Sequence, residues 1–156
     1  MPAEVQKLKE SWKKSTSDEK YLLILVFGIL MFLFFPWESY SYGQYGSIVY
    51  FSRNGLRSYG NLTFLGSILY LAVKILPMAG IKIPDMGMEQ KMMEKILAGA
   101  IFAGPVLWLL SSNFYFSIIG FGFWVDLVLS GFFSYLVFTE KKFSEVKTLL
   151  FRKKQK

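Results

Sequence analysis

The sequence contains neither cysteine nor histidine. The lack of cysteine excludes disulfides, thiolate redox chemistry and cysteine-ligated iron–sulfur clusters, and the lack of both residues excludes ordinary zinc sites. Without histidine there is also no histidine general base and no histidine ligand for haem. Catalysis would have to rely on Asp, Glu, Lys, Tyr or Ser. We therefore predict a protein that is not an enzyme and that uses no metal or cofactor.

Apolar runs and aromatic residues dominate what is present. Hydrophobic residues make up 53% of the 156 residues and aromatic residues 19%, with a mean hydropathy of +0.37, which exceeds the balance of a soluble domain. A helix needs about 20 mostly apolar residues to cross a hydrocarbon core about 30 Å thick. Interfacial aromatic residues complete the shorter of four such runs, at about 21–37, 61–77, 95–111 and 114–138. We predict an all-α membrane protein whose four transmembrane helices form a compact bundle within residues 21–138.

The net charge is +7, and 12 of the 18 lysines and arginines lie at the two ends of the chain, in residues 1–20 and 139–156. Cytoplasmic segments of membrane proteins carry an excess of Lys and Arg, so both termini are expected in the cytoplasm, which requires an even number of spans. We expect a multi-pass protein of the cell (inner or plasma) membrane without a cleavable signal peptide. Its basic tails should contact anionic lipid headgroups rather than nucleic acid.

Both tails carry apolar residues at helical spacing between lysines. In residues 3–15 these are Val5, Leu8 and Trp12, and in the basic tail 139–156 they are Phe143, Val146 and Leu150. This pattern predicts an amphipathic interfacial helix at each terminus. The alternative is a solvated tail whose charges only set orientation. Thr16 and Glu19 have capping-box spacing, so a second helix is expected to begin there.

The exterior loop 38–60 is rich in tyrosine and glycine. Its β-prone stretches and the Asn54-Gly55 pair predict a short hairpin. Arg53 and Arg57 are candidate contacts for an exterior anion or sugar-bearing ligand, since Arg pairs with phosphate. The simpler interpretation is an aromatic belt on lipid, with both arginines reaching headgroups.

The sharpest functional clue is Asp126, a carboxylate near the middle of the fourth run. Such a residue is expensive in a bilayer and usually faces a bundle interior or a cavity. On a helix it shares a face with Tyr115, Gly122 and Ser130. A polar stripe on the second run could face it, formed by Thr63, Ser67, Tyr70 and Lys74. Lys74 either pairs with Asp126, which is marginal in depth, or reaches the cytoplasmic headgroups. Otherwise Asp126 is protonated, hydrated, or bonded to Tyr70, Ser67 or another protein.

Small residues on the last two runs predict close helix packing. The candidate packing residues are Gly99, Ala103, Gly104 and Gly122. Pro105 cannot donate to the carbonyl of Ile101 and should kink its helix. The freed carbonyl then needs a donor from a neighbouring helix or from water.

Three functions compete on these observations. The favoured one is a structural or assembly subunit of a larger membrane complex or homo-oligomer, supported by the small-residue helices and the amphipathic tails. The alternative is a small ion, proton or solute channel or carrier using Asp126 at the midplane, with a holin-like pore as a variant. A lipid-handling enzyme using Arg53 and Arg57 ranks last, because no nucleophile and base occur at a recognisable spacing.

Overall fold

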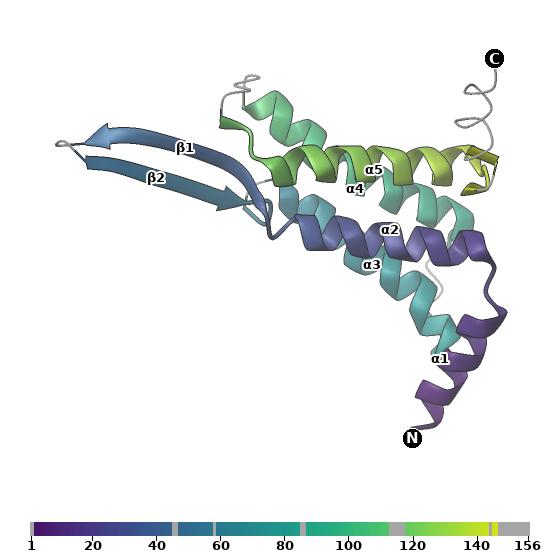
Figure 1. Cartoon of the computed structure of the whole chain (residues 1–156). Coiled ribbons are helices and arrows are strands. Elements are labelled where there is room, and N and C mark those ends of the chain that lie inside the picture. The colour runs from purple at the N-terminus through teal and green to yellow at the C-terminus, as the bar shows by residue number, and fades with distance from the viewer. Residues whose placement is uncertain are drawn as a thin grey trace, which may run out of the picture.

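The computed structural model describes residues 2–44, 47–57, 59–84, 87–112, 118–143 and 145–146. Five helices and two strands follow one another in this part of the chain (Figure 1). In chain order they are α1 (Ala3–Lys14), α2 (Ser17–Phe32), β1 (Pro36–Gln44), β2 (Ser47–Asn54), α3 (Gly60–Met78), α4 (Gln90–Ser111) and α5 (Phe121–Thr139).

Helices α2 to α5 form a bundle in which α2 and α4 each pack against both α3 and α5. Helices α3 and α5 therefore lie on one diagonal of the bundle, and both begin at the end from which the strands emerge (Figure 1). One buried cluster takes side chains from all four helices: Val26 and Ile29, Tyr70, Ala98 and Ile101, and Phe133. The predicted helical bundle is confirmed.

Three of these helices, α3, α4 and α5, are long and apolar enough to cross a membrane, within the residues that the structure describes. This agrees with a membrane protein. Helix α2 has 16 residues, a length of about 24 Å, which is less than the roughly 30 Å of a hydrocarbon core. The capping box predicted at its start is present, with Thr16 N–H donating to Glu19 Oε2 (2.9 Å) and Glu19 N–H donating to Thr16 Oγ1 (3.2 Å).

In the last apolar run, predicted to span 114–138, helix α5 begins at Phe121. Residues 113–117 lie outside the described part of the chain. Just before the helix, Ile119 forms a bridge with Glu38, and the N–H of Gly120 donates to the Trp37 carbonyl (2.8 Å). A side chain at position 120 would overlap the backbone of Pro36. This close approach holds the segment extended and sets the start of α5.

The third run also differs from its predicted bounds, since α4 begins at Gln90 rather than near residue 95. Pro105 lies inside this helix. The Ile101 carbonyl, which Pro105 leaves without a helical donor, accepts a hydrogen bond from Thr63 Oγ1 of α3 (3.0 Å). The expected donor from a neighbouring helix is therefore confirmed.

Strands β1 and β2 form a two-stranded antiparallel sheet in which Tyr40 faces Phe51, so the predicted hairpin is confirmed. Its turn was predicted wrongly. The Asn54-Gly55 pair ends β2, and the strands are joined through residues 45–46, which lie outside the description. Position 55 requires glycine for close packing and not for the hairpin turn, because a Cβ there would overlap the Trp37 indole. The hairpin extends away from the bundle at the end opposite α1 (Figure 1).

Helix α1 turns away from the direction of α2 and lies beside the C-terminal end of α3 (Figure 1). Ser11 Oγ donates to the Met78 carbonyl (3.0 Å), and Val5, Leu8 and Trp12 line a hollow with Ile75 and Met78. None of the residues of α1 is buried. Most of the helix predicted for residues 139–156 lies outside the described residues. Phe143, which is described, stacks on Tyr21 at 4.6 Å between ring centroids.

Candidate functional site

Asp126 lies inside the bundle, in the second turn of α5. Its side chain is fully buried (0% exposed), and neither carboxylate oxygen has a hydrogen-bond partner among the described residues. It is five residues from the start of α5, or about 8 Å along the helix. Within α5, which runs from Phe121 to Thr139, Asp126 is therefore closer to the first residue than to the last. The carboxylate is nearer to the hairpin end of the bundle.

Helix α3 presents two further buried hydroxyls to the bundle interior. Ser67 and Tyr70 are both 0% exposed, and neither hydroxyl has a partner among the described residues. The ring of Tyr70 meets that of Phe133 edge to face, with centroids 4.9 Å apart, which places these two residues at one level. Along the helices from that level towards the hairpin, Ser67 and Ser130 lie about 5 Å away and Asp126 lies about 10 Å away.

We call Asp126, Ser130, Ser67 and Tyr70 the interior polar site. All four were predicted from the sequence, and all four face the bundle interior. Ser130 Oγ donates to the Leu127 carbonyl of its own helix (3.2 Å). Other interior hydroxyls also bond to the backbone, as Thr63 does to Ile101 (3.0 Å) and Ser134 to Ala98 (2.7 Å). Against this background, the carboxylate of Asp126 stands out as the strongest acceptor left without a donor in the described residues.

Aromatic rings close the interior polar site at both ends. On the hairpin side, Trp37, Trp108 and Phe123 form an outer aromatic layer, with centroids 4.6 to 5.9 Å apart and at most 3% exposure. Phe123 is one turn of α5 before Asp126. On the other side, Tyr70 and Phe133 form an inner aromatic layer. The polar residues are therefore enclosed between two packed layers. The sequence carried no signal for the outer layer, since its three rings come from separate segments.

Lys74 does not reach Asp126, although that pair was the obvious one in the sequence. Its Nζ lies 2.7 Å from Glu94 Oε1, and the two side chains are 18% and 16% exposed. Lys74 is four residues before the end of α3, and Glu94 is four residues after the start of α4. Because these helices are antiparallel neighbours, the two residues fall at one level. Equal spacing from the connecting loop was the signal that could have identified Glu94.

A second charged group joins α4 to the end of α5 outside the apolar interior. Glu140, directly after α5, accepts from Lys95 Nζ (2.9 Å) and Lys91 Nζ (3.3 Å). The hydrogen bond from Lys95 and then that from Lys91 lower the pKa of the Glu140 carboxyl below its ordinary value. This group and the Lys74–Glu94 pair put charges at the bundle end farther from the hairpin.

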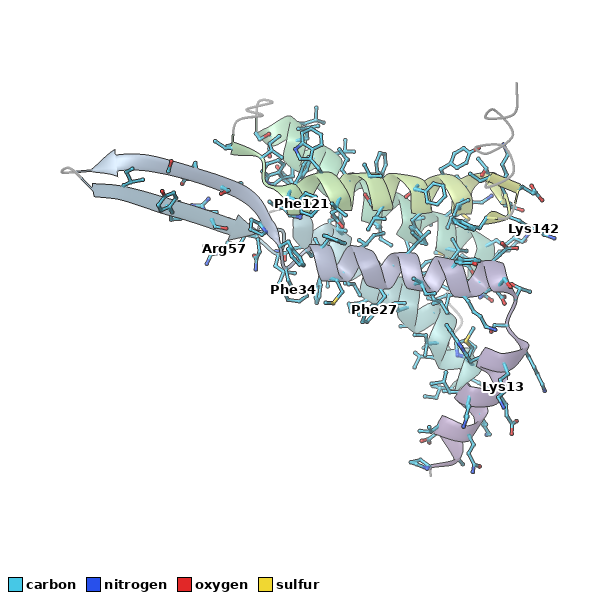
Figure 2. All side chains as sticks on the ribbon, in the orientation of Figure 1. Lys13, Phe27, Phe34, Arg57, Phe121 and Lys142 are labelled. Atoms are coloured by element: carbon cyan, nitrogen blue, oxygen red, sulfur yellow. The ribbon has the colours of Figure 1, made fainter. Side chains whose placement is uncertain are left out.

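The two arginines that were predicted to face the exterior lie at the base of the hairpin. Arg53 Nη1 is 3.8 Å from Glu38 Oε2, and Glu38 Oε1 also accepts from Trp108 Nε1 (3.2 Å). Arg57 is exposed and forms no salt bridge with the residues described. It shares an open groove with Phe34, and Figure 2 shows both at the junction of hairpin and bundle.

The small residues predicted for helix packing are used within the chain. A Cβ at Gly104 would overlap Thr63 of α3, and one at Gly122 would press on Phe35 and Pro36. Gly99 is looser, since a Cβ there would lie 3.7 Å from Phe138. Ala103, one turn further along α4, is half-buried. The close contacts of Gly104 and Gly122 are therefore intramolecular.

Comparisons with protein-family models, curated proteins and solved structures give no match for this chain.

Proposed function

We propose that this protein is a four-span subunit of a larger membrane assembly, in the cell (inner or plasma) membrane, and that it contacts its partner through the β1–β2 hairpin. The observation that carries the proposal is the hairpin itself. It projects beyond the bundle, and its strand β2 exposes Tyr50 (80%) and Ile48 (67%) (Figure 1).

The fourth span in this proposal is α2, which is short but apolar on its outer face. Phe27 and Met31 of α2 are 61% and 50% exposed, and Phe34, just after the helix, is 58% exposed. Large apolar side chains on an outer surface suit lipid and not water. The turn after α2, which ends in Phe34 and Phe35, extends its apolar length towards that of the other three helices.

The proposed orientation puts both termini in the cytoplasm and the hairpin outside. Lys13 and Lys142 lie at the bundle end opposite Arg57 (Figure 2), as expected if basic tails face the cytoplasm. Helix α1, beside the end of α3, would then lie on the membrane surface with its lysines at anionic headgroups. On the other side, Arg57 and Phe34 would meet at headgroup level, with the arginine on phosphate and the ring in lipid.

An exposed two-stranded hairpin needs external support. Such a sheet is marginally stable by itself in water, and three strands or a packed face are usually required. Here Tyr40 stacks on Phe51 on one face (5.2 Å), while Tyr50 is on the opposite face and exposed. Tyrosines are enriched where proteins meet, and unpaired strand edges invite another strand. A partner subunit, or a second copy of this chain, would supply the missing contacts.

The test compares the size of the assembly before and after the hairpin surface is changed. The wild-type protein, extracted in mild detergent, should migrate as a complex, and the double variant Ile48→Ser/Tyr50→Ser should release the chain as a monomer. Ser52→Ala, also exposed on β2, is the matched control and should leave the complex intact. A wild-type protein that stays monomeric both in native-lipid nanodiscs and in detergent would refute the proposal.

A second candidate function is a small channel or carrier for a proton, ion or solute, with a holin-like pore as its variant. The buried carboxylate of Asp126 favours it, because an ionisable residue inside a membrane bundle commonly marks a transport path. Flux into proteoliposomes decides the matter. Transport that is present in the wild type and lost in Asp126→Asn supports this function, whereas equal flux in both, or none in either, eliminates it.

A further inference from the structure

The carboxylate of Asp126 occupies surroundings that cannot support a negative charge. It is 0% exposed, and both oxygens are without a donor among the described residues. An ionised carboxylate requires either water or several donors, and one buried without either is strongly disfavoured. The Asp126 carboxylate must therefore bind a positive charge to be accommodated inside the bundle.

The charged side chains on the surrounding elements are all engaged or distant. On α3 and α4, Lys74 pairs with Glu94 (2.7 Å), and both lie towards the end of the bundle away from the hairpin. The remaining charges of α4 and of the end of α5 meet one another at Lys91, Lys95 and Glu140. The charges of α2 lie in its first turn, at Asp18, Glu19 and Lys20. Beyond the outer aromatic layer, Arg53 is 3.8 Å from Glu38. No described lysine or arginine neutralises Asp126.

We propose that Asp126 is a proton-binding residue, which holds a proton in the closed bundle and exchanges it with the hairpin side of the membrane. A proton is the one cation that needs no coordination shell of its own, and it converts the carboxylate into a neutral acid that the apolar surroundings tolerate. The proposal holds whether or not the protein transports anything, and it is independent of the hairpin's partner.

The direction of exchange follows from the unequal thickness of the two barriers. Towards the hairpin, Asp126 is five residues, or about 8 Å, from the start of α5, behind the layer of Trp37, Trp108 and Phe123. In the other direction, thirteen residues, or about 20 Å, separate it from Thr139, and the Tyr70–Phe133 layer lies between. The shorter route crosses a single aromatic layer to the hairpin side.

Infrared spectroscopy of the intact protein in lipid tests proton occupancy. The chain has three aspartates, Asp18, Asp85 and Asp126, so labelling aspartate with 13C at the carboxyl carbon yields few bands. At pH 7 the wild type should show one band of a protonated carboxylic acid, which Asp126→Asn removes and Asp18→Asn retains. Only ionised aspartate bands in the wild type at pH 7 would overturn the proposal, and this measurement does not depend on any variant folding.

Exchange in D2O tests reversibility and direction. The acid band should shift after transfer of the protein to D2O, and a band that never shifts would mean a locked acid and overturn the exchange. Thinning the outer layer with Phe123→Ala should accelerate the shift several-fold. The matched change in the inner layer, Phe133→Ala, should accelerate it less, and the opposite order would overturn the assignment to the hairpin side.

Discussion

The hydrogen bond from Thr63 to Ile101 offers the sharpest quantitative test of the fold, because the proline that makes this bond necessary can be replaced separately. Thr63 Oγ1 donates to the Ile101 carbonyl over 3.0 Å, and both residues are 0% exposed. That carbonyl lacks its helical donor because residue 105, four positions on, is proline and has no N–H. Thr63→Val keeps the shape of the side chain and removes the donor, so a buried carbonyl loses its bond.

The expected cost follows from that burial. Interhelical hydrogen bonds in membranes contribute about 0.6 kcal/mol on average and up to about 1.7, whereas a buried group left unsatisfied costs about 1–3 kcal/mol. Because Thr63 Oγ1 supplies this carbonyl with a donor from a neighbouring helix, we expect Thr63→Val to destabilise the bundle by about 1–2 kcal/mol, a factor of about 5–30 in the unfolding equilibrium. In a Pro105→Ala background, residue 105 regains its N–H and bonds to Ile101, so the same change should cost no more than about 0.5 kcal/mol.

The assay is reversible unfolding in bicelles, followed by circular dichroism or steric trapping, on the four proteins of this double-mutant cycle. Thr63→Ser retains the donor and serves as the control for altered packing. A cost for Thr63→Val that is equal in the wild-type and Pro105→Ala backgrounds would refute the reasoning. The hydroxyl would then contribute through packing and not by satisfying the carbonyl that proline frees.

Three further predictions concern close contact and charge. Gly104→Ala should destabilise the bundle by more than about 2 kcal/mol because the new Cβ overlaps α3, whereas Gly99→Ala should change stability by less than about 1 kcal/mol, both measured in the same unfolding assay. Glu94→Gln should cost about 1–3 kcal/mol by leaving Lys74 unpaired, and the double variant Lys74→Met/Glu94→Gln should recover part of that loss. The pKa of Glu140 is lowered in the folded chain, so its ionised carboxylate stabilises the fold fully above the ordinary pKa of about 4.5, and this stabilisation is lost as the pH falls through the lowered pKa. Thermal unfolding measured against pH should show this loss for the wild type and not for Glu140→Gln.

Local rules succeeded where the cause and its effect are neighbours in the sequence. The capping box at Thr16 and Glu19 and the unsatisfied carbonyl before Pro105 both follow from backbone hydrogen bonding over three or four residues. The inward direction of Ser67 and Tyr70 follows from helical periodicity. Each of these needs only the geometry of one helix, which the residues themselves determine.

The failures share a different cause, since each depends on a contact between distant segments. Gly55 resembles a turn glycine until the Trp37 indole is found against it, and Gly120 ends the extended segment because it lies on the backbone of Pro36. A hydropathy run cannot show that Ile119 and Gly120 are held in front of the helix by contacts with a strand far away in the chain. For the same reason, Lys74 was matched with the most conspicuous carboxylate and not with Glu94, which lies at its own level on the neighbouring helix.

The position of Asp126 separates two roles that the sequence leaves joined. A lone carboxylate on a helix with small residues suits an assembly contact, because a partner could supply the missing donor. In the folded chain the carboxylate is 0% exposed and enclosed by aromatic layers, while the small residues, including Gly122 beside it, are occupied by contacts within the chain. A partner on the outside of the bundle cannot reach it. In the proposed assembly, the contact therefore rests on the hairpin, and Asp126 is explained by the chemistry of the bundle interior, where a proton is the simplest charge that satisfies it.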